Sequence, residues 1–457
     1  MVIASIDIQD GKVVQLKQGS ELVLQQDNAV ELAEEFDRCG EVAVIDLDAA
    51  MGKVPAGNGG ASPGNLEMIK PLLRKAECRV GGGIRSAAQA KELVSLGARK
   101  IIVGSACFRD PAKKGAGVSG GEFRVNIPFL EDLAKTIGRE RIIAAVDARI
   151  TEKGNYEIVV DGWKTPTSLD LTAAAKEAEP FVSEFLFTCV EREGCMEGIN
   201  PEPVRRLREA VSCGLTVAGG VSTIEEVETL ARLGCDVQLG MALYTGKLSL
   251  ADCFVRSLNW EKGQAPVGLP PGGSAAGASL LPLIVQSPGG QVLMTGFADA
   301  DAVAETFKRG RVCFHSRSRD RLWMKGESSG HTLSLIRLRA DCDRDAILAT
   351  AEPAGPVCHT GAFSCFGLDR RYTWDFLQSI VAGRLKTAAP GSYTATLDDE
   401  LVREKILEEA EELCAAKGRN EMIWEAADLL YFATVLLTRE GVKVEEILDE
   451  LDRRHKE

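Results

Sequence analysis

Eight short apolar runs alternate with helical patterns in the first half of this 457-residue chain, and no other feature restricts its fold as much. The runs are rich in Val and Ile, which favour strands, and most precede a segment with apolar residues at helical spacing. Eight strand–helix units over about 250 residues predict a (β/α)₈ TIM barrel. The predicted strands are Val2–Ile8, Val42–Leu47, Cys78–Val80, Lys100–Val103, Ile142–Val146, Phe185–Thr188, Thr216–Ala218 and Asp236–Leu239. Helix patterns include Val30–Cys39, Ala87–Gly97, Ile127–Ile137 and Ile224–Leu233.

An internal repeat supports the barrel. The segment VGGGIRS at 80–86 recurs as VAGGVST at 217–223, and Gly97 recurs as Gly234. From 80 to 217 and from 97 to 234 the offset is the same, 137 positions. A constant offset of this kind predicts two similar half-barrels.

Glycines follow several predicted strands, at the end of a barrel where function is usually found. Their backbone amides can approach a phosphate closely, and the repeat places two such sites on opposite sides of the ring. This arrangement fits a long substrate with a phosphate at each end. The alternative is that the glycines only form tight turns. The candidate phosphate-binding residues are Gly82, Gly83, Gly104, Gly219, Gly220 and Gly240.

Proton transfer in the barrel has to rely on carboxylates, because no histidine precedes His315. Asp7, Asp147 and Glu193 stand at predicted strand ends and are the catalytic candidates. Each could instead cap a helix or form an ion pair.

The first 250 residues resemble the phosphoribosylformimino-AICAR-ribotide isomerase family, whose substrate has two phosphoribosyl arms. The matching segments are IDIQDGKVV at 6–14, VIDLDAA at 44–50, VGGGIRS at 80–86, AAVDAR at 144–149, GW at 162–163 and GMALYTGKLSL at 240–250.

The resemblance implies that Asp7 is the general base of an Amadori rearrangement. The family's general acid lies in an Asp-Gly pair on strand six, which reads Glu193-Gly194 here. This departure and a Gly-rich insertion at 113–121 leave two alternatives, an active isomerase or a barrel retired to a scaffold.

A Gly-, Pro- and Ser-rich stretch at 260–279 predicts a linker after the barrel. We therefore expect a multidomain chain, with a barrel at 1–259, a second domain at 280–368 and a third at 369–457. The second domain is predicted as a compact α+β unit. Its predicted elements are strands at Leu281–Gln286, Gln291–Met294, Val312–Ser316, Thr332–Arg339 and Ala346–Glu352 and a helix at Ala300–Arg309.

Residues 341–367, DCDRDAILATAEPAGPVCHTGAFSCFG, contain ligands suited to two metals. Thiolates of Cys342, Cys358 and Cys365 suit Zn²⁺, and three thiolates leave one position for a water molecule. Carboxylates of Asp341, Asp343 and Asp345 suit Mg²⁺, and their period of two predicts one face of an extended segment. His359 is then free to move protons. The alternative is a solvated turn with core cysteines.

This stretch resembles phosphoribosyl-AMP cyclohydrolase, whose pattern is DCDxD followed by CHTGxxSCF. The segment GRVCFHSRSRDRLWMKGESSGH at 310–331 agrees with it. The resemblance implies the zinc and magnesium ligands above, catalysis by His359, and attack of water on C6 of the adenine ring. Arg317, Arg319 and Lys325 are a candidate phosphate grip, or a solvated loop.

The chain is predicted to be helical from Trp374 to its end. Two acidic helices, Asp399–Ala416 and Asn420–Arg439, are predicted, with Gly418 as a C-terminal cap between them. Leu413, Ile423, Leu429, Leu430 and Val435 are expected to form their core side. Carboxylates three or four positions apart share a helix face, so antiparallel packing can gather them around Mg²⁺. The alternative is a solvent-facing charged stripe. The candidate ligands are Glu408, Glu409, Glu412, Glu425 and Asp428.

This acidic pattern, with SYTATL at 392–397, resembles phosphoribosyl-ATP pyrophosphatase, an all-helical family that releases pyrophosphate from a triphosphate. The three resemblances are successive steps of histidine biosynthesis, so phosphoribosyl nucleotides are the expected substrates. The resemblance to helical pyrophosphatases and cyclohydrolases, which are dimers, implies a homodimer. Three rivals remain: a two-activity enzyme with a scaffold barrel, a metal-stabilised binding protein, and a general nucleotide pyrophosphatase.

Composition limits the partners and the compartment. A net charge of −13 and only 5% aromatic residues argue against binding to nucleic acid or an anionic membrane. No apolar run reaches the roughly 18 residues of a membrane span. Thirteen cysteines, an odd number, indicate reduced thiols and metal ligands and thus a cytoplasmic protein.

Overall fold

A computed structural model describes residues 1–457 except 18, 53–62, 109–122, 153, 264–278, 368, 370–371, 388–392 and 456–457. The predicted insertion at 113–121 and most of the predicted linker therefore lie outside the described residues. The described chain forms two compact units. The first contains Met1–Val285 and Thr295–Ala354, and the second contains Gln286–Met294 and Gly355–Glu457.

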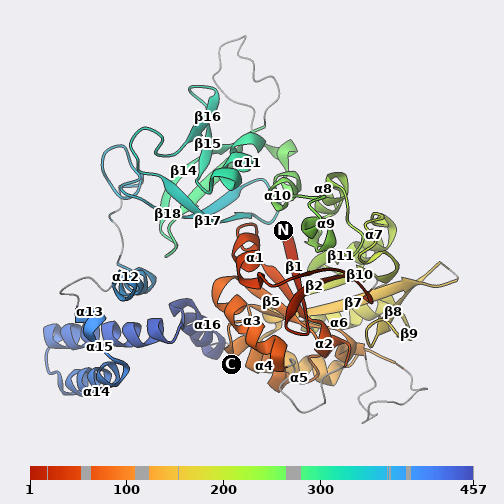
Figure 1. Ribbon diagram of the computed structural model, residues 1–457, viewed down its shortest axis with the longest axis horizontal. Helices are drawn as coiled ribbons and strands as arrows, with labels where there is room; N and C mark the ends of the chain where they lie inside the picture. The colour runs from red at the N-terminus through yellow and green to blue at the C-terminus, as the bar shows by residue number, and fades with distance from the viewer. Residues whose placement is uncertain are drawn as a thin grey trace. The chain divides into compact units, whose positions relative to one another are not determined.

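The N-terminal part of the first unit is a closed barrel of eight parallel strands with helices around it (Figure 1). The ring closes because β10 pairs with both β11 and β7. All eight predicted strands are confirmed, with ends shifted by a few residues. They are β1 (Val2–Gln9), β4 (Val42–Asp46), β5 (Cys78–Gly81), β6 (Lys100–Val103), β7 (Ile142–Ile150), β10 (Glu184–Cys189), β11 (Gly214–Ala218) and β12 (Asp236–Leu239).

Helices cover the barrel because their apolar stripes pack on the outward-facing Val and Ile of the strands. The four predicted helices are present as α1, α4, α5 and α8. The main helices of this part are α1 (Ala29–Phe36), α3 (Pro63–Lys75), α4 (Ala87–Ser95), α5 (Ile127–Ile137), α6 (Leu171–Ala178), α7 (Pro201–Ala210), α8 (Ile224–Arg232) and α10 (Leu250–Ser257). Shorter ones are α2 (Leu47–Ala50), η1 (Ser105–Phe108), η2 (Arg139–Arg141), η3 (Glu179–Phe181), η4 (Val190–Arg192), α9 (Met241–Tyr244) and η5 (Trp260–Lys262).

Two antiparallel extensions of the barrel sheet were not predicted. One consists of β2 (Lys12–Lys17) and β3 (Glu21–Gln26), and the other of β8 (Tyr156–Val160) and β9 (Thr165–Asp170). Both continue barrel strands at their C-terminal ends, because β2 pairs with the end of β1 and β8 with the end of β7. They therefore stand at the end of the barrel where a site is expected.

The residues after the barrel form a small α+β fold, most of which lies in the first unit. Its four-stranded sheet has the order β14–β13–β18–β17, and α11 (Ala300–Arg309) is the predicted helix. A separate hairpin pairs β15 with β16 in antiparallel register. The strands are β13 (Leu281–Gln286), β14 (Val292–Ala298), β15 (Cys313–Ser316), β16 (Arg321–Met324), β17 (Leu333–Ala340) and β18 (Ile347–Pro353).

The second unit is mainly helical, as predicted. Its helices are α12 (Trp374–Thr387), α13 (Tyr393–Thr396), α14 (Asp399–Ala415), α15 (Arg419–Arg439) and α16 (Val444–His455). Leu377, Val381, Val402, Phe432 and Val435 form its core.

Two details of the helical prediction are wrong. Gly418 is extended and begins α15 as its N-terminal cap, whereas Ala416 ends α14. Ile423 and Leu430 do not face the core, since their side chains are 54% and 38% exposed. Val435, by contrast, is fully buried as expected.

Candidate functional site

A cavity of about 500 Å³ opens at the C-terminal ends of the barrel strands. Asp7 comes from β1, Asp147 from β7, and Glu193 directly follows η4 at the end of β10. The structure therefore gathers the three predicted acid–base residues around one cavity, although 186 positions separate the first from the last. All six predicted phosphate-binding glycines also line this cavity: Gly82, Gly83, Gly104, Gly219, Gly220 and Gly240.

Among the described residues, no cation lowers the pKa values of these three carboxyl groups. Burial raises the pKa of Asp7 to about 6, opposed by a hydrogen bond from the Ser5 hydroxyl to its Oδ1 (2.7 Å). Burial, with the negative charges of Asp7 and Asp147, raises the pKa of Glu193 to about 7. Among the described residues, Glu193 Oε2 is one of the few buried side-chain oxygens that have no hydrogen-bond partner. Such an atom is available to a bound molecule.

Two glycine loops bring backbone close to this cavity. Gly82 (φ +114°) lies against the carbonyl of Asp46, and Gly219 (φ +89°) leaves room for Glu193, whose Oε2 would be 2.8 Å from an added Cβ. A side chain at either position would collide with these neighbours, so glycine is required sterically and conformationally. Gly104 immediately precedes η1, and Gly240 is the N-terminal cap of α9. The first amides of a helix have no partner within it and can bind an anion.

Trp163 is a cavity residue that the sequence did not single out as part of the site. It sits at the turn between β8 and β9 with a positive φ of 69°, and its indole N–H donates to Asp147 Oδ2 (2.9 Å). The turn is also tied to the barrel, because Ser105 Oγ accepts the N–H of Asp161 (2.9 Å). The GW pair at 162–163, which matches the isomerase family, was a signal for this residue. Its contact with Asp147 could not be predicted from the spacing of the two residues.

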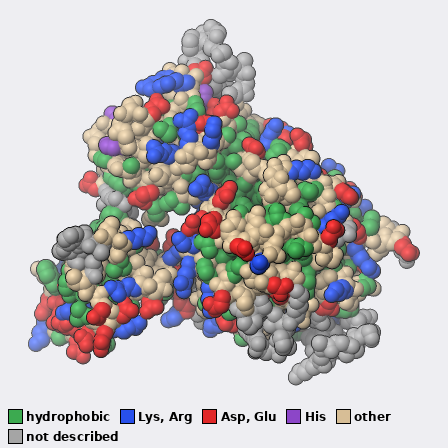
Figure 2. Space-filling view, viewed as in Figure 1, with side chains coloured by type: hydrophobic (Ala, Val, Ile, Leu, Met, Phe, Trp, Pro, Cys, Tyr) green, Lys and Arg blue, Asp and Glu red, His purple; other side chains and the backbone are tan. Residues whose placement is uncertain are grey.

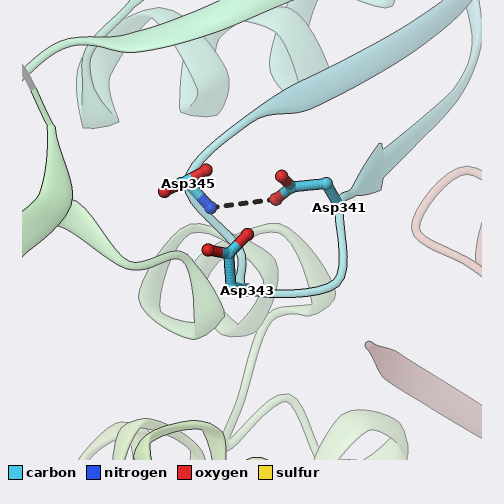
Figure 3. A group of neighbouring side chains, drawn as sticks. All are labelled: Asp341, Asp343 and Asp345. Carbon is cyan, nitrogen blue, oxygen red and sulfur yellow. Dashed lines mark hydrogen bonds between the residues drawn. The ribbon is translucent and has the colours of Figure 1, made fainter.

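The three aspartates of the second metal motif are brought together, but not as predicted. Asp341, Asp343 and Asp345 each offer an oxygen within 4.8 Å of the others (Figure 3). The segment is a tight turn between β17 and β18, so the prediction of an extended strand is wrong. Arg344 is left-handed (φ +63°), and Asp341 Oδ1 accepts the N–H groups of Asp345 (3.0 Å) and Ala346 (3.1 Å). This reversal, not a period of two, gathers the carboxylates.

The predicted zinc ligands are divided between the two units. Cys342 is exposed in the acidic turn of the first unit, whereas Cys358 and Cys365 belong to the second. In the second unit the Thr360 hydroxyl donates to Cys358 Sγ (3.1 Å), and hydrogen bonds from Thr360 lower the pKa of that thiol. His359 is exposed beside it, with Nδ1 3.8 Å from Cys358 Sγ.

The predicted phosphate grip is spread along the β15–β16 hairpin. Arg317 and Arg319 are exposed in its turn, and the Arg317 guanidinium lies 3.9 Å from the centre of the Phe297 ring. Lys325 follows β16 at the other end of the hairpin and is buried. The hairpin therefore presents two of the three cations together.

The acidic helices of the second unit bring carboxylates from α14 and α15 together. Glu409, Glu412 and Glu425 offer oxygens within 4.8 Å of one another. Burial, followed by the charge of Asp428, raises the pKa of Glu409; burial and Glu412 raise that of Glu425. Glu408 is instead paired with Lys405 (2.6 Å). Figure 2 shows many acidic side chains over these helices.

Known families match all three parts of the chain. The model of the family described as histidine biosynthesis protein matches residues 1–249, phosphoribosyl-AMP cyclohydrolase matches 294–367, and phosphoribosyl-ATP pyrophosphohydrolase matches 375–455. These matches confirm the predicted order of a barrel, a cyclohydrolase domain and a helical pyrophosphohydrolase domain.

Relatives of the two later domains are named histidine biosynthesis bifunctional protein HisIE. The protein from Bacteroides thetaiotaomicron is 41% identical over 186 residues, which are 38% of this chain and 92% of the relative. The proteins from Salmonella typhimurium and Bacillus subtilis are each 39% identical, over 211 and 193 residues. These alignments span 44% and 39% of this chain and 96% and 92% of the relatives.

Among the described residues, no helix is both long and apolar enough to cross a membrane. The first family model spans more than half of the chain, and the HisIE relatives are matched over nearly their whole length. The chain therefore belongs to the histidine biosynthesis protein family, and it also carries the phosphoribosyl-AMP cyclohydrolase and phosphoribosyl-ATP pyrophosphohydrolase domains of the HisIE proteins.

Proposed function

We propose that this histidine-biosynthesis chain performs three successive reactions. It removes pyrophosphate from phosphoribosyl-ATP, opens the adenine ring of phosphoribosyl-AMP, and isomerises the product in the barrel. The domain matches support the first two activities. The domain limits we propose are 1–259 for the barrel, 280–368 for the cyclohydrolase and 369–457 for the pyrophosphohydrolase.

The observation that carries the isomerase proposal is the pair of raised pKa values in the barrel cavity. With a pKa of about 7, much of Glu193 keeps its proton at neutral pH, while Asp7, at about 6, is mostly ionised. An Amadori rearrangement needs an acid for the ring oxygen and a base for the proton on the neighbouring carbon. We assign Glu193 as the acid and Asp7 as the base, because both line one cavity and Glu193 Oε2 has no hydrogen-bond partner among the described residues.

The remaining cavity residues have supporting roles in this proposal. Asp147, held by the Trp163 indole, is also a catalytic candidate through its charge. The six glycines bind the two phosphates, three at each side of the barrel, with their backbone amides. The cavity volume of about 500 Å³ is in the range of small-molecule sites.

In the cyclohydrolase we propose Zn²⁺ on Cys342, Cys358 and Cys365 and Mg²⁺ on Asp341, Asp343 and Asp345. The donors fit these ions, since thiolates prefer zinc and clustered carboxylates prefer a hard cation. Zinc, when bound, supplies an activated water for attack on C6 of the adenine ring. His359 moves the proton, and Arg317, Arg319 and Lys325 bind phosphate.

In the pyrophosphohydrolase we propose Mg²⁺ on Glu408, Glu409, Glu412, Glu425 and Asp428. Crowded carboxylates with raised pKa values favour a divalent cation, which removes their mutual repulsion. Bound Mg²⁺ neutralises charge on the triphosphate during attack of water.

We further propose a homodimer that acts in the cytoplasm. Large apolar side chains on α14 and α15 are exposed, which is typical of a surface that a second copy covers. They include Leu407, Met422, Ile423, Trp424 and Leu430. All thirteen cysteines are free thiols, in keeping with a reducing compartment.

The test supplies the full chain with phosphoribosyl-ATP and follows each intermediate by liquid chromatography with mass spectrometry, because the isomerisation leaves the mass unchanged and its substrate and product have to be separated. Asp7→Asn should lower isomerisation by about 10²- to 10⁴-fold, because it removes the base, and should leave pyrophosphate release and ring opening unchanged. Asp27→Asn, at an exposed carboxylate 82% accessible, is the matched control. Isomerisation at the wild-type rate in Asp7→Asn would show that the barrel is a scaffold.

A further inference from the structure

The acidic turn of the cyclohydrolase domain is held by residues of the barrel and of the short segment that follows it. Asp341, Asp343 and Asp345 lie on this turn, and its backbone folds back through the bond from Asp345 N–H to Asp341 Oδ1 (Figure 3). The barrel and this turn belong to the same compact unit. Two barrel-linked contacts reach the turn, one through Arg344 and one through Lys262.

Arg344 is the residue that reverses the chain between the carboxylates. Its φ of +63° is unfavourable for a residue with a side chain, so surrounding bonds have to compensate. The guanidinium donates to the carbonyl oxygens of Ala231 and Cys235 (2.6 Å to the latter) and to Asp236 Oδ1 (3.1 Å). The Arg344 carbonyl in turn accepts the N–H of Asn259 (2.7 Å).

Lys262 places a cation on the carboxylates themselves. Its ammonium group is 2.5 Å from Asp343 Oδ2 and 3.6 Å from Asp345 Oδ2. Lys262 ends η5, and Trp260 of the same turn is tied back to α10 by a bond from its indole to the Val255 carbonyl (2.9 Å). The ammonium group therefore neutralises part of the negative charge that a divalent ion would neutralise if it were bound to these carboxylates.

We propose that the barrel and the short segment that follows it, which contains Lys262, form part of the carboxylate metal site of the cyclohydrolase. Arg344 is a positioning residue that holds the turn through its bonds to the barrel, and Lys262 is an internal cation that a hard divalent ion displaces. This inference rests on the proposed assignment of a metal to Asp341, Asp343 and Asp345. The two residues act in opposite directions, because one organises the site and the other competes for it.

The test measures Mn²⁺ binding to the full chain by electron paramagnetic resonance of the free ion. The second acidic cluster is first removed by Glu409→Gln, Glu412→Gln and Glu425→Gln, so that only the turn is observed. In this background Arg344→Ala should weaken Mn²⁺ binding about tenfold, as expected for the loss of an outer partner of a metal site.

Two further variants separate the causes. Arg344→Gly tolerates the positive φ but lacks the guanidinium, so it should weaken binding as much as Arg344→Ala if the bonds to the barrel matter. Lys262→Gln should strengthen binding about two- to fivefold, the range expected for an exposed ion pair, and more at low salt. Lys308→Gln, which removes a lysine paired with Glu305 (3.1 Å), is the control and should change nothing.

The outcomes distinguish the proposed role of the barrel from the metal assignment on which it rests. If Asp343→Asn binds Mn²⁺ as the background protein does, the assignment of the metal to this turn is wrong. If Asp343→Asn loses the ion while Arg344→Ala and Lys262→Gln keep the background affinity, the assignment stands and the role of the barrel is refuted. A positioning role also predicts that raised Mg²⁺ restores ring opening in Arg344→Ala with the other domains intact.

Discussion

The two ends of the barrel treat buried carboxylates in opposite ways. Glu184 is the first residue of β10 and Glu193 follows that strand, so the two lie at opposite ends of one element. The charges of Arg79 and Lys100 outweigh burial and lower the pKa of Glu184 to about 2. Burial and neighbouring carboxylates raise the pKa of Glu193 to about 7.

The two ends of the barrel differ in the charged groups that contact the carboxylates. At the N-terminal end, the fully buried Arg79 contacts Glu41 and Glu184 (2.5 Å to the latter), and the Lys100 ammonium is 3.0 Å from Glu184. At the C-terminal end, no cation in the described part of the chain lowers the pKa of Asp7, Asp147 or Glu193. A paired cluster serves stability, whereas unpaired acids are available for a substrate.

Breaking the paired end should have the largest effect. Arg79→Met leaves Glu41 and Glu184 buried with too little positive charge, and the barrel should lose about 3–5 kcal/mol of unfolding free energy. Hydrogen exchange of the β10 amides measures this loss in the full chain, without assuming that all domains unfold together.

Arg206→Met is the control for this substitution, because Arg206 and Glu202 form an exposed pair (2.9 Å) on α7. It should change the same exchange rates by no more than about 0.5 kcal/mol. Equal hydrogen-exchange protection of the β10 amides in Arg79→Met and Arg206→Met would mean that the buried cluster does not stabilise the N-terminal end of the barrel.

The pH dependence of stability should have opposite signs at the two ends. The pKa of Glu184 is lowered, so its contribution is present above about 4.5 and lost as pH falls towards 2. The pKa of Glu193 is raised, so its contribution is present below about 4.5 and lost as pH rises through 7. Glu193→Gln should therefore stabilise the barrel at pH 8, by on the order of 2 kcal/mol, and hardly affect it at pH 4.5.

Exchange of the β10 amides at several pH values, corrected for the intrinsic rates, measures this difference. The control is Glu197→Gln, at an exposed carboxylate of the following loop. A stabilisation that is the same at pH 4.5 and pH 8 would indicate a packing effect and would contradict the raised pKa.

The sequence predicted the features of the fold that depend on local, repeating patterns of residues. The eight strands, such as Val2–Gln9, follow from β-branched runs, and the cavity follows from the rule that strand ends form the site. Among the hairpin strands, Thr165–Asp170 is mostly polar and has no clear period, whereas Lys12–Lys17 and Tyr156–Val160 contain β-branched runs that were available as strand signals. The contact between Trp163, at the turn of one hairpin, and Asp147 could not be predicted from their spacing in the sequence.

Two errors have different causes, one non-local and one local. The acidic turn looks extended in sequence because aspartates recur at every second position, yet Arg344 reverses the chain through bonds to residues about 110 positions away. Gly418 looks like a helix end, but the following helix uses it as a beginning. Composition identified the metal-ligand types, and only the folded chain shows which of them meet.

The smallest expected effect is at the C-terminal end of the barrel, where Trp163 contacts Asp147. Trp163→Phe removes the N–H that donates to Asp147 Oδ2 and thereby lowers the pKa of that carboxyl. Its loss should raise the pKa of Asp147 further and destabilise the ionised form by about 1 kcal/mol. The lost packing of the indole is the same at every pH, whereas the lost hydrogen bond matters most when Asp147 is charged. Destabilisation measured by exchange of the β7 amides should thus be larger at pH 8 than at pH 4.5, and equal values would leave only a packing role for Trp163.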